Sequence, residues 1–191
     1  MEETLTGFKY IGDKICKYEK SGSNDFVIGY EESYGYLVGT HARDKDAVVS
    51  SMLICEMASY YKNQGKTLVQ VLEEIYRRYG YYLDSLDSFV LRGKDGAQKI
   101  SELMTYFRTH ADTVFAGVET VGRLIDFAAG VGDLPKENVL KFVFADGSWL
   151  AVRPSGTEPK IKVYYSIKSS DRPAAQARLQ RIRDLIVKVI S

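Results

Sequence analysis

Cysteine and histidine are scarce in this chain, with two of each among 191 residues. Cys16 and Cys55 lie too far apart for a paired thiolate motif, and two cysteines are too few for a disulfide framework. This usage is typical of a protein kept in a reducing compartment, so the expected location is cytoplasmic. His41 and His110 are not at metal-ligand spacing, which argues against a histidine-based metal site.

The chain also lacks a long apolar run and a strong excess of either charge. No segment approaches the roughly 20 apolar residues that a membrane-spanning helix needs. The opening residues, Met-Glu-Glu-Thr, lack the basic and apolar regions of a signal peptide. The formal net charge is +1, which gives the whole chain no electrostatic bias toward nucleic acid or anionic membranes. We therefore expect neither as a partner, and any anion site must be a local feature.

What is present is a globular composition, with 45% hydrophobic and 27% charged residues, long enough for one good core or two small ones. Thr4 or Thr6 is expected to cap a first helix, and Thr67 with Gln70 makes a capping box for a later one. The elements expected in a first unit are a helix over 4–16, a short buried strand over 26–30, a well-buried helix over 46–62 and a helix from Thr67 onward.

Residues 81–191 carry a different pattern, in which period-2 alternation predominates and Asp146-Gly147 is a strong hairpin signal. The expected elements are strands over 82–92, 114–124, 139–144, 148–153 and 161–166, helices over 96–108 and 173–190, and a loop over 126–136. The basic residues of the last helix are expected to form a solvated face. The pattern predicts an antiparallel sheet packed on two helices, a two-layer α+β unit.

Residues 153–159, Arg-Pro-Ser-Gly-Thr-Glu-Pro, lie between two of these strands. Gly156 permits a backbone conformation that other residues resist. Such a turn can direct the backbone N–H groups of Ser155, Gly156 and Thr157 into one concavity, with two hydroxyls beside them. Arg153 adds a planar fork that suits a phosphate. The residues predict an anion cradle; a hairpin whose hydroxyls only satisfy the turn remains the alternative.

A second polar group follows the strand expected over 26–30. Residues 31–35, Glu-Glu-Ser-Tyr-Gly, place a carboxylate and a hydroxyl on a tight loop. Carboxylates accept hydrogen bonds from vicinal hydroxyls, and open α/β sheets bind ligands at the carboxyl ends of their strands. The loop is therefore a candidate for sugar binding, with an acidic turn at a strand end as the alternative.

Together the two segments resemble motifs of the α-D-phosphohexomutases, the phosphoglucomutase and phosphomannomutase superfamily. Residues 153–159 resemble the phosphate-binding loop of the family's last domain, and residues 31–35 resemble the sugar-binding loop of its third domain. Residues 5–9 and 40–46 are similar to the segments that flank the sugar loop, so the resemblance covers essentially the whole chain.

The resemblance implies a fold and a site. Residues 1–80 would be a partial α/β third domain that binds sugar, and residues 81–191 a two-layer α+β C-terminal domain, with a mainly antiparallel sheet, that binds phosphate. Lysine would make a point-charge contact at position 162, where relatives may carry arginine. The residues that would bind sugar hydroxyls are Thr6, Glu31, Ser33, His41 and Lys45, and those that would hold the non-reacting phosphate are Arg153, Ser155, Gly156, Thr157 and Lys162.

The family's catalytic serine loop and its Asp-x-Asp-Gly-Asp-Arg metal loop do not occur in this sequence. The resemblance therefore implies a C-terminal fragment with no catalytic residue and no metal ligand of its own, expected to be inactive in isolation. Its partners would be a hexose phosphate and the missing N-terminal domains. The full-length enzyme would interconvert glucose 1-phosphate and glucose 6-phosphate, using Mg²⁺ and glucose 1,6-bisphosphate.

The sugar loop, Glu-Glu-Ser-Tyr-Gly, resembles the glucose-type members of the family more than the others. A phosphomannomutase or phosphopentomutase fragment stays open, as does a phosphosugar-binding module without chemistry of its own. The net charge disfavours a nucleic-acid binder.

Overall fold

A computed structural model describes residues 1–91, 95–156 and 158–191. The chain divides into two compact units, Met1–Glu73 and Glu74–Ser191, each of which is described by itself. Within the described part of the chain, no helix is both long and apolar enough to cross a membrane.

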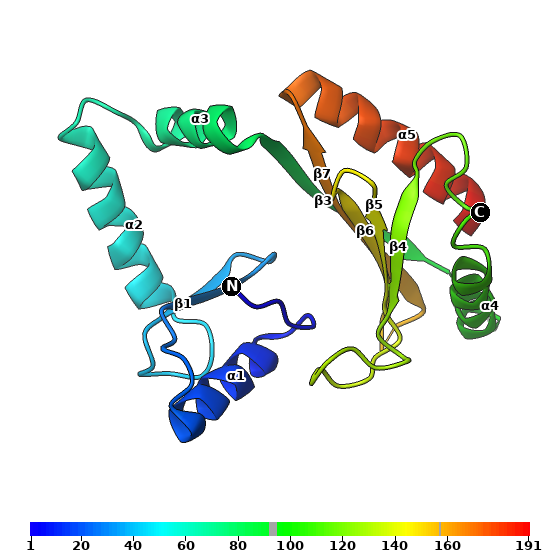
Figure 1. The fold of residues 1–191 in the computed structure, drawn as a ribbon, viewed down its shortest axis with the longest axis horizontal. Helices are drawn as coiled ribbons and strands as arrows, with labels where there is room; N and C mark the ends of the chain where they lie inside the picture. The colour runs from blue at the N-terminus through cyan, green and yellow to red at the C-terminus, as the bar shows by residue number, and fades with distance from the viewer. Residues whose placement is uncertain (92–94, 157) are drawn as a thin grey trace. The chain divides into compact units, whose positions relative to one another are not determined.

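The first unit contains one small hairpin, against which its first two helices pack. Its buried cluster comprises Phe8, Ile15 and Leu37. Asp46 caps the second helix by accepting hydrogen bonds from the N–H groups of Val48 and Val49. The elements are α1 (Phe8–Ser21), β1 (Ile28–Glu31), β2 (Gly35–Val38), α2 (Ala47–Lys62) and α3 (Leu68–Tyr79), the last of which contains the boundary between the units (Figure 1).

The helix expected over 4–16 is wrong at both ends. Its N-cap is Gly7, without a side-chain cap, and the Thr4 hydroxyl donates instead to the Leu5 carbonyl. The helix ends at Ser21, and the C-cap residue Gly22 has a left-handed backbone with a φ of 64°. The apolar stripe was placed correctly, but the last turns are polar and carry no periodic signal. The capping box of α3 is confirmed, because Thr67 Oγ1 accepts from Gln70 N and Gln70 Oε1 accepts from Thr67 N.

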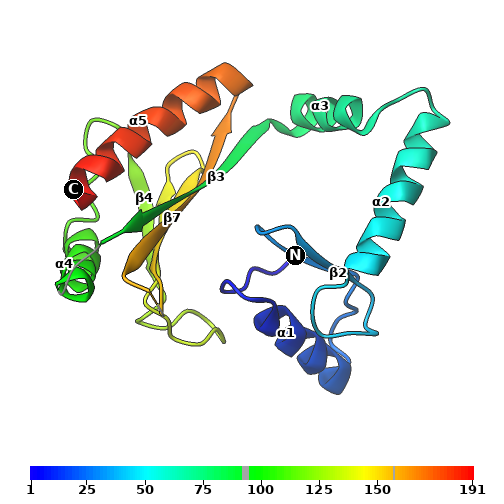
Figure 2. The same ribbon diagram turned by 180° about the vertical axis from the view of Figure 1, so that it is seen from behind.

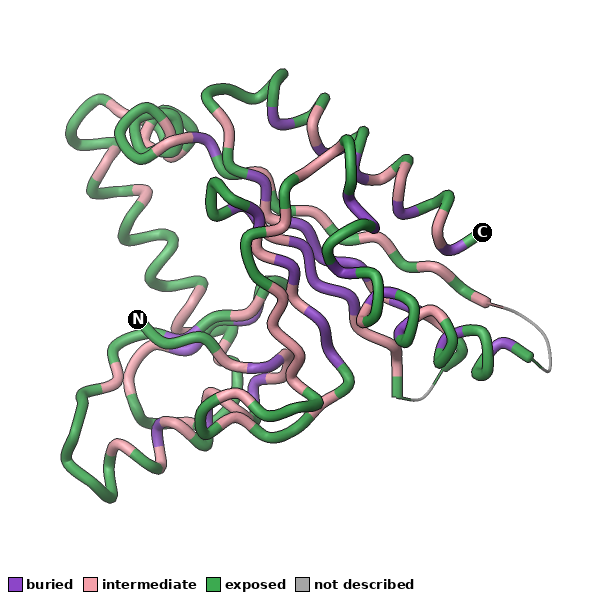
Figure 3. Tube along the Cα trace, turned by 45° about the vertical axis from the view of Figure 1, so that its right-hand side comes forward, coloured by how far each residue is buried: buried purple, intermediate pink, exposed green. Residues whose placement is uncertain are grey.

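The burial expected for residues 26–30 and 46–62 is also wrong. Within its unit β1 pairs antiparallel with β2 alone, and its apolar side chains are exposed. Helix α2 has no buried residue, with Val48 80% and Met52 64% exposed (Figure 3). An apolar composition indicates that a segment favours burial. It does not indicate that the surface covering the segment belongs to the same unit.

The second unit is a five-stranded antiparallel sheet with strand order β3-β7-β6-β5-β4. Its helices, α4 (Gly96–Thr109) and α5 (Arg172–Ile190), lie on one face of the sheet and share its core (Figures 1 and 2). This confirms the predicted two-layer arrangement. The strands are β3 (Tyr81–Val90), β4 (Val121–Asp126), β5 (Leu140–Phe144), β6 (Trp149–Pro154) and β7 (Lys160–Ser169).

The strand expected over 114–124 is correct only at its end: residues 114–118 form turns, and β4 begins at Val121. Val114 and Phe115 are buried there, and Phe115 packs edge-on against Phe142 with ring centroids 5.0 Å apart. Apolar residues in a turn can fill a core as strand residues do, which explains the error. The hairpin predicted at Asp146-Gly147 is confirmed, with Gly147 at φ 87°.

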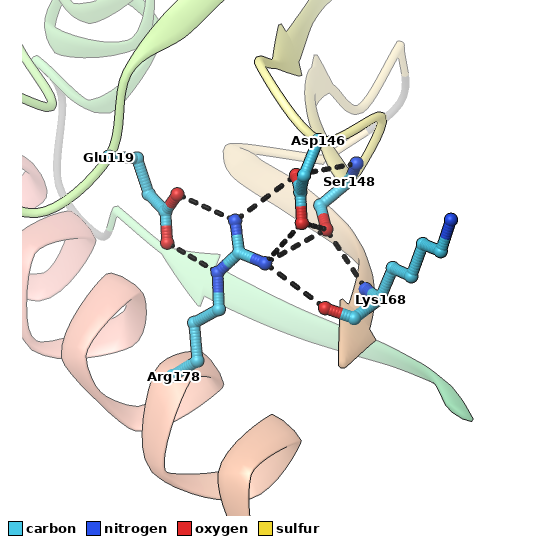
Figure 4. A network of polar contacts seen from close by, with 5 residues as sticks. All are labelled: Glu119, Asp146, Ser148, Lys168 and Arg178. Atoms are coloured by element: carbon cyan, nitrogen blue, oxygen red, sulfur yellow. Dashed lines mark hydrogen bonds and ion pairs between the residues drawn. The ribbon is translucent and has the colours of Figure 1, made fainter. Parts of the chain in front are cut away.

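The basic face expected on the last helix is only partly solvated. Arg178 donates to both carboxylate oxygens of Glu119, at 2.6 and 2.7 Å, and to Asp146 Oδ2 at 2.6 Å (Figure 4). It also donates to the Lys168 carbonyl at 3.0 Å. The side chains of Arg178 and Glu119 are only 18% and 9% exposed. This network ties α5 to two loops and to β7, and Arg183 similarly binds Asp87 of β3.

Candidate functional site

The hairpin β1–β2 brings Glu31 and Ser33 together. Glu31 pairs with Gly35 at the end of the ladder, which leaves a three-residue connection between the strands. The Ser33 hydroxyl donates to Glu31 Oε1 at 3.0 Å. The loop therefore holds a carboxylate and a hydroxyl side by side, as a sugar-binding group requires.

Lys45 joins this pair from the segment before α2. Its Nζ lies 3.6 Å from Glu31 Oε1, 3.0 Å from Asp44 Oδ1 and 5.2 Å from the centre of the Phe8 ring. The hydrogen bond with Asp44 raises the pKa of Lys45 and, from the other side, lowers the pKa of Asp44. The Glu31 side chain is only 14% exposed, so its carboxylate is held in place by neighbours rather than by water. We call Glu31, Ser33 and Lys45 the hairpin triad.

Gly35 allows the triad to form. A Cβ at this position would overlap Lys45 Cδ and lie 2.9 Å from Glu31 Oε1. The lysine side chain thus packs directly over the glycine backbone. Close approach is a reason for glycine that the sequence pattern alone did not reveal.

His41 and Thr6 occupy other places in the unit. His41 Nε2 lies 2.8 Å from Asp46 Oδ2, so the ring is tied to the cap of α2, and this contact is the main cause of the lowered pKa of Asp46. Thr6 lies just ahead of the N-cap Gly7 and is half-buried. Of the sugar-binding residues predicted, the described contacts therefore unite Glu31, Ser33 and Lys45, and not these two.

The second candidate group lies at the β6–β7 hairpin. Arg153 and Lys162 are directly opposite each other across the two strands. Their neighbours Val152, Ile161 and Val163 are buried in the core, so the two cations project from the face that the helices leave open. Like charges placed opposite each other are unfavourable. The nearby Glu137 Oε2, 3.8 Å from Arg153 Nε, offsets part of that repulsion. An anion binding here would offset more.

The loop itself differs from the predicted cradle in two respects. The Ser155 N–H donates to the Lys160 carbonyl at 2.9 Å and closes the hairpin, so this amide does not point into a ligand cavity. Gly156 does not have a positive φ, and a Cβ built on it would meet no atom within 4 Å, so its conformation does not require glycine. Thr157 lies outside the described residues. What the loop offers in this structure is chiefly the cation pair, with Ser155 beside it.

The described residues do not fit a resident metal ion, because they include no group of three or more His, Cys, Asp or Glu side chains placed to hold one. No step is therefore assigned to Mg²⁺ on this chain. The sequence reasoning missed Gly35, Glu137 and the backbone of Tyr34, which has a φ of 64°. Only Gly35 left a signal, as a glycine that ends a polar turn.

Comparison with known proteins gives a consistent result. Residues 1–79 match the family model for phosphoglucomutase/phosphomannomutase, alpha/beta/alpha domain III, and residues 106–187 match the model for the C-terminal domain of the same proteins. The hairpin triad lies within the first match, and Arg153 and Lys162 lie within the second.

Among curated proteins, the chain is 42% identical over 177 residues to a phosphoglucomutase of Staphylococcus epidermidis, covering 87% of this chain and 32% of the relative. It is 39% identical over 180 residues to a phosphoglucomutase of Staphylococcus aureus, covering 89% of this chain and 32% of the relative. The chain thus spans about a third of the length of the curated relatives it matches.

A crystal structure of the exocytosis-sensitive phosphoprotein pp63/parafusin, a phosphoglucomutase from Paramecium, in an open form, has the same fold. It aligns with a TM-score of 0.71 at 21% identity and covers 98% of this chain and 33% of its own. Two family models in their expected order, relatives at 39–42% identity and a shared fold all agree. The chain belongs to the phosphoglucomutase/phosphomannomutase superfamily, of which it carries domain III and C-terminal domain sequence.

Proposed function

We propose that this chain is the substrate-binding C-terminal part of a phosphoglucomutase, which interconverts glucose 1-phosphate and glucose 6-phosphate in the cytoplasm when the protein is whole. Residues 1–80 bind the sugar and residues 81–191 bind a phosphate. The chain supplies no phosphoryl carrier; the remaining domains, with Mg²⁺ and glucose 1,6-bisphosphate, supply the transfer chemistry.

The observation that carries this proposal is the hairpin triad. Ser33 and Lys45 both contact Glu31 and so fix the direction of its carboxylate, and an oriented carboxylate accepts hydrogen bonds from two neighbouring sugar hydroxyls. Ser33 is the second contact to the ring, and Lys45 a flexible cation beside it. Thr6 and His41 are proposed to complete this group when substrate is bound.

The cation pair of the β6–β7 hairpin takes the phosphate. Arg153 provides a fork that matches two phosphate oxygens, and Lys162 adds a point charge from the neighbouring strand. Ser155, Gly156 and Thr157 are proposed to add hydroxyl and amide donors. A group of this kind recognises charge and leaves the identity of the sugar to the hairpin triad.

The relatives are named phosphoglucomutases, which favours a glucose phosphate over a mannose or pentose phosphate. Titration of the full-length gene product with glucose, mannose and ribose phosphates would test that preference. Equal affinity for all three would contradict the assignment to glucose.

Replacing Arg153 with alanine tests the phosphate group. We expect Arg153→Ala to weaken glucose 1-phosphate binding by about 1.5–3 kcal/mol, the usual contribution of a hydrogen bond to a charged group. Isothermal titration of the full-length gene product measures it. The matched control is Arg123→Ala, which removes an exposed arginine from the far edge strand β4 and should leave affinity unchanged. Identical affinity of both variants would count decisively against the proposal.

A further inference from the structure

The connection between β1 and β2 contains an unusual residue. Tyr34 has a φ of 64°, the only positive φ outside glycine among the residues described, whereas nine glycines have this conformation. In a three-residue hairpin connection the last position often adopts the left-handed conformation, for which glycine is the favoured residue. For tyrosine the same backbone is unfavourable because of its Cβ.

The Tyr34 side chain is also unfavourably placed for folding. It is 87% exposed, so the apolar ring gains little from burial. In the described part of the chain, no hydrogen bond, ring contact or cation contact involves it. Its backbone strain and its exposed ring are thus both left without compensation inside the first unit. Strained residues that persist in this way cluster at ligand-binding sites.

Its position suggests which ligand compensates for both. Tyr34 follows Ser33 directly and precedes Gly35, so it belongs to the same turn as the hairpin triad. A hexose ring presents hydroxyls at its edge and an apolar C–H surface on its faces. Glu31 and Ser33 suit the edge, and an aromatic ring suits a face.

We propose that Tyr34 is a sugar-contacting residue whose ring packs against a face of the hexose held by Glu31 and Ser33. This inference rests on the proposed function and adds a contact that selects for a cyclic sugar. The unfavourable backbone is retained because the ring is needed at that point of the turn.

The proposal makes stability and affinity change in opposite directions. In the full-length gene product, Tyr34→Gly removes the strain and the ring together. We expect an unfolding midpoint no lower than that of the parent protein, and an affinity for glucose 1-phosphate reduced roughly three- to tenfold. Tyr34→Phe keeps the ring and should bind within about twofold of the parent. Tyr60→Ala, which removes a tyrosine of α2 outside the turn, is the control for affinity and should leave glucose 1-phosphate binding unchanged.

Other outcomes identify what is wrong. A lowered midpoint for Tyr34→Gly would mean that the ring packs against protein, and unchanged affinity would mean that it does not touch the sugar; either overturns the proposal. An equal loss in Tyr34→Phe would assign the effect to the hydroxyl and overturn the ring contact. Glu31→Gln and Ser33→Ala distinguish failure of the Tyr34 contact from failure of the proposed function. If both weaken binding and Tyr34→Gly does not, only this inference fails; if neither does, the proposed function fails.

Discussion

Gly35 controls the hairpin triad although it has no side chain of its own. Lys45 packs over its Cα, and this close approach brings Nζ to within 3.6 Å of Glu31. Its φ is not positive, so a larger residue is excluded by contact and not by backbone conformation. The obstructing atoms belong to the flexible side chain of Lys45, which can move aside. A Cβ at position 35 would therefore leave the fold intact but break the hairpin triad.

Gly35→Ala should therefore separate binding from folding. We expect the free energy of unfolding to change by no more than about 1 kcal/mol, and glucose 1-phosphate binding to weaken by about 1–2 kcal/mol as Lys45 is displaced. Calorimetric titration and denaturant unfolding measure the two quantities. In a Lys45→Ala background the same substitution should have little further effect on binding. Additive losses would show that Gly35 acts on something other than Lys45.

Asp146 has its pKa lowered from 3.8 to about 2, chiefly by its hydrogen bond with Arg178. A carboxyl whose pKa is lower in the folded state stabilises that state above its unfolded pKa, and the contribution is lost as pH falls from about 4 toward 2. The stability advantage of the parent chain over Asp146→Asn should thus be constant near neutral pH and shrink below about pH 4. Urea unfolding between about pH 6 and pH 3 tests this. A difference independent of pH would mean that the Asp146 carboxylate has no favoured partner.

At the level of elements, Arg178 fastens α5 to the sheet. It links Glu119, which follows the turns after α4, to the β5–β6 connection and to β7 (Figure 4). The group depends on Arg178, because without it the nearly buried Glu119 carboxylate would have neither its ion-pair partner nor full access to water.

Arg178→Ala should destabilise the second unit by about 3 kcal/mol, since it leaves the nearly buried Glu119 without its partner. Arg181→Ala provides the matched control: it lies on the same helix, is exposed and should cost less than about 0.5 kcal/mol. Chemical denaturation followed by far-ultraviolet circular dichroism distinguishes them. Equal effects would mean that the network contributes nothing beyond surface charge.

Most elements of the second unit could be predicted from sequence because its strands alternate and its hairpin carries Asp-Gly. The first strand of that sheet, β3, and both helices lie within a few residues of their expected bounds. The prediction failed where the hydrophobic pattern does not match the observed structure. Residues 114–118 are mainly apolar but form turns, and α2 is apolar but exposed. Arg178 could not be identified as a buried link, because its partners lie 32 and 59 residues away.

At the scale of the whole molecule, the two units differ in the size of their hydrophobic cores and therefore in the stability expected of each. The first unit's buried cluster contains Phe8, Ile15 and Leu37, whereas that of the second draws on three strands, β5, β6 and β7, and on both helices. A small core gains little against chain entropy, so the first unit is expected to be the less stable.

Hydrogen exchange should show this difference directly. In the 191-residue chain alone, we expect amides of α2 to exchange much faster than those of α5, because α2 buries no residue and α5 buries five. In the full-length gene product α2 should become protected. Equal protection of α2 and α5 in the isolated chain would contradict the expectation.

The candidate site could be predicted only in part. The chemistry of Glu31 with Ser33 is local and was accessible from the sequence, but Lys45 entered through the family resemblance. Lys162 also entered through the resemblance, and its position opposite Arg153 follows from the strand register that the structure shows. The backbone of the loop was not predictable, since whether the Ser155 amide faces a ligand or the Lys160 carbonyl depends on how the hairpin closes.

The order of strands in the five-stranded sheet has a consequence for folding during synthesis on the ribosome. Of the strands in this sheet β3 is synthesised first, yet among the described residues it pairs with β7 alone, with Tyr81 opposite Ser169 and Val90 opposite Lys160. Bringing together such distant partners is entropically slow. The backbone N–H and C=O groups of β3 that bond to β7 therefore stay unpaired until the whole of the intervening chain has left the ribosome. A chaperone that binds the nascent chain would be of most use during this interval.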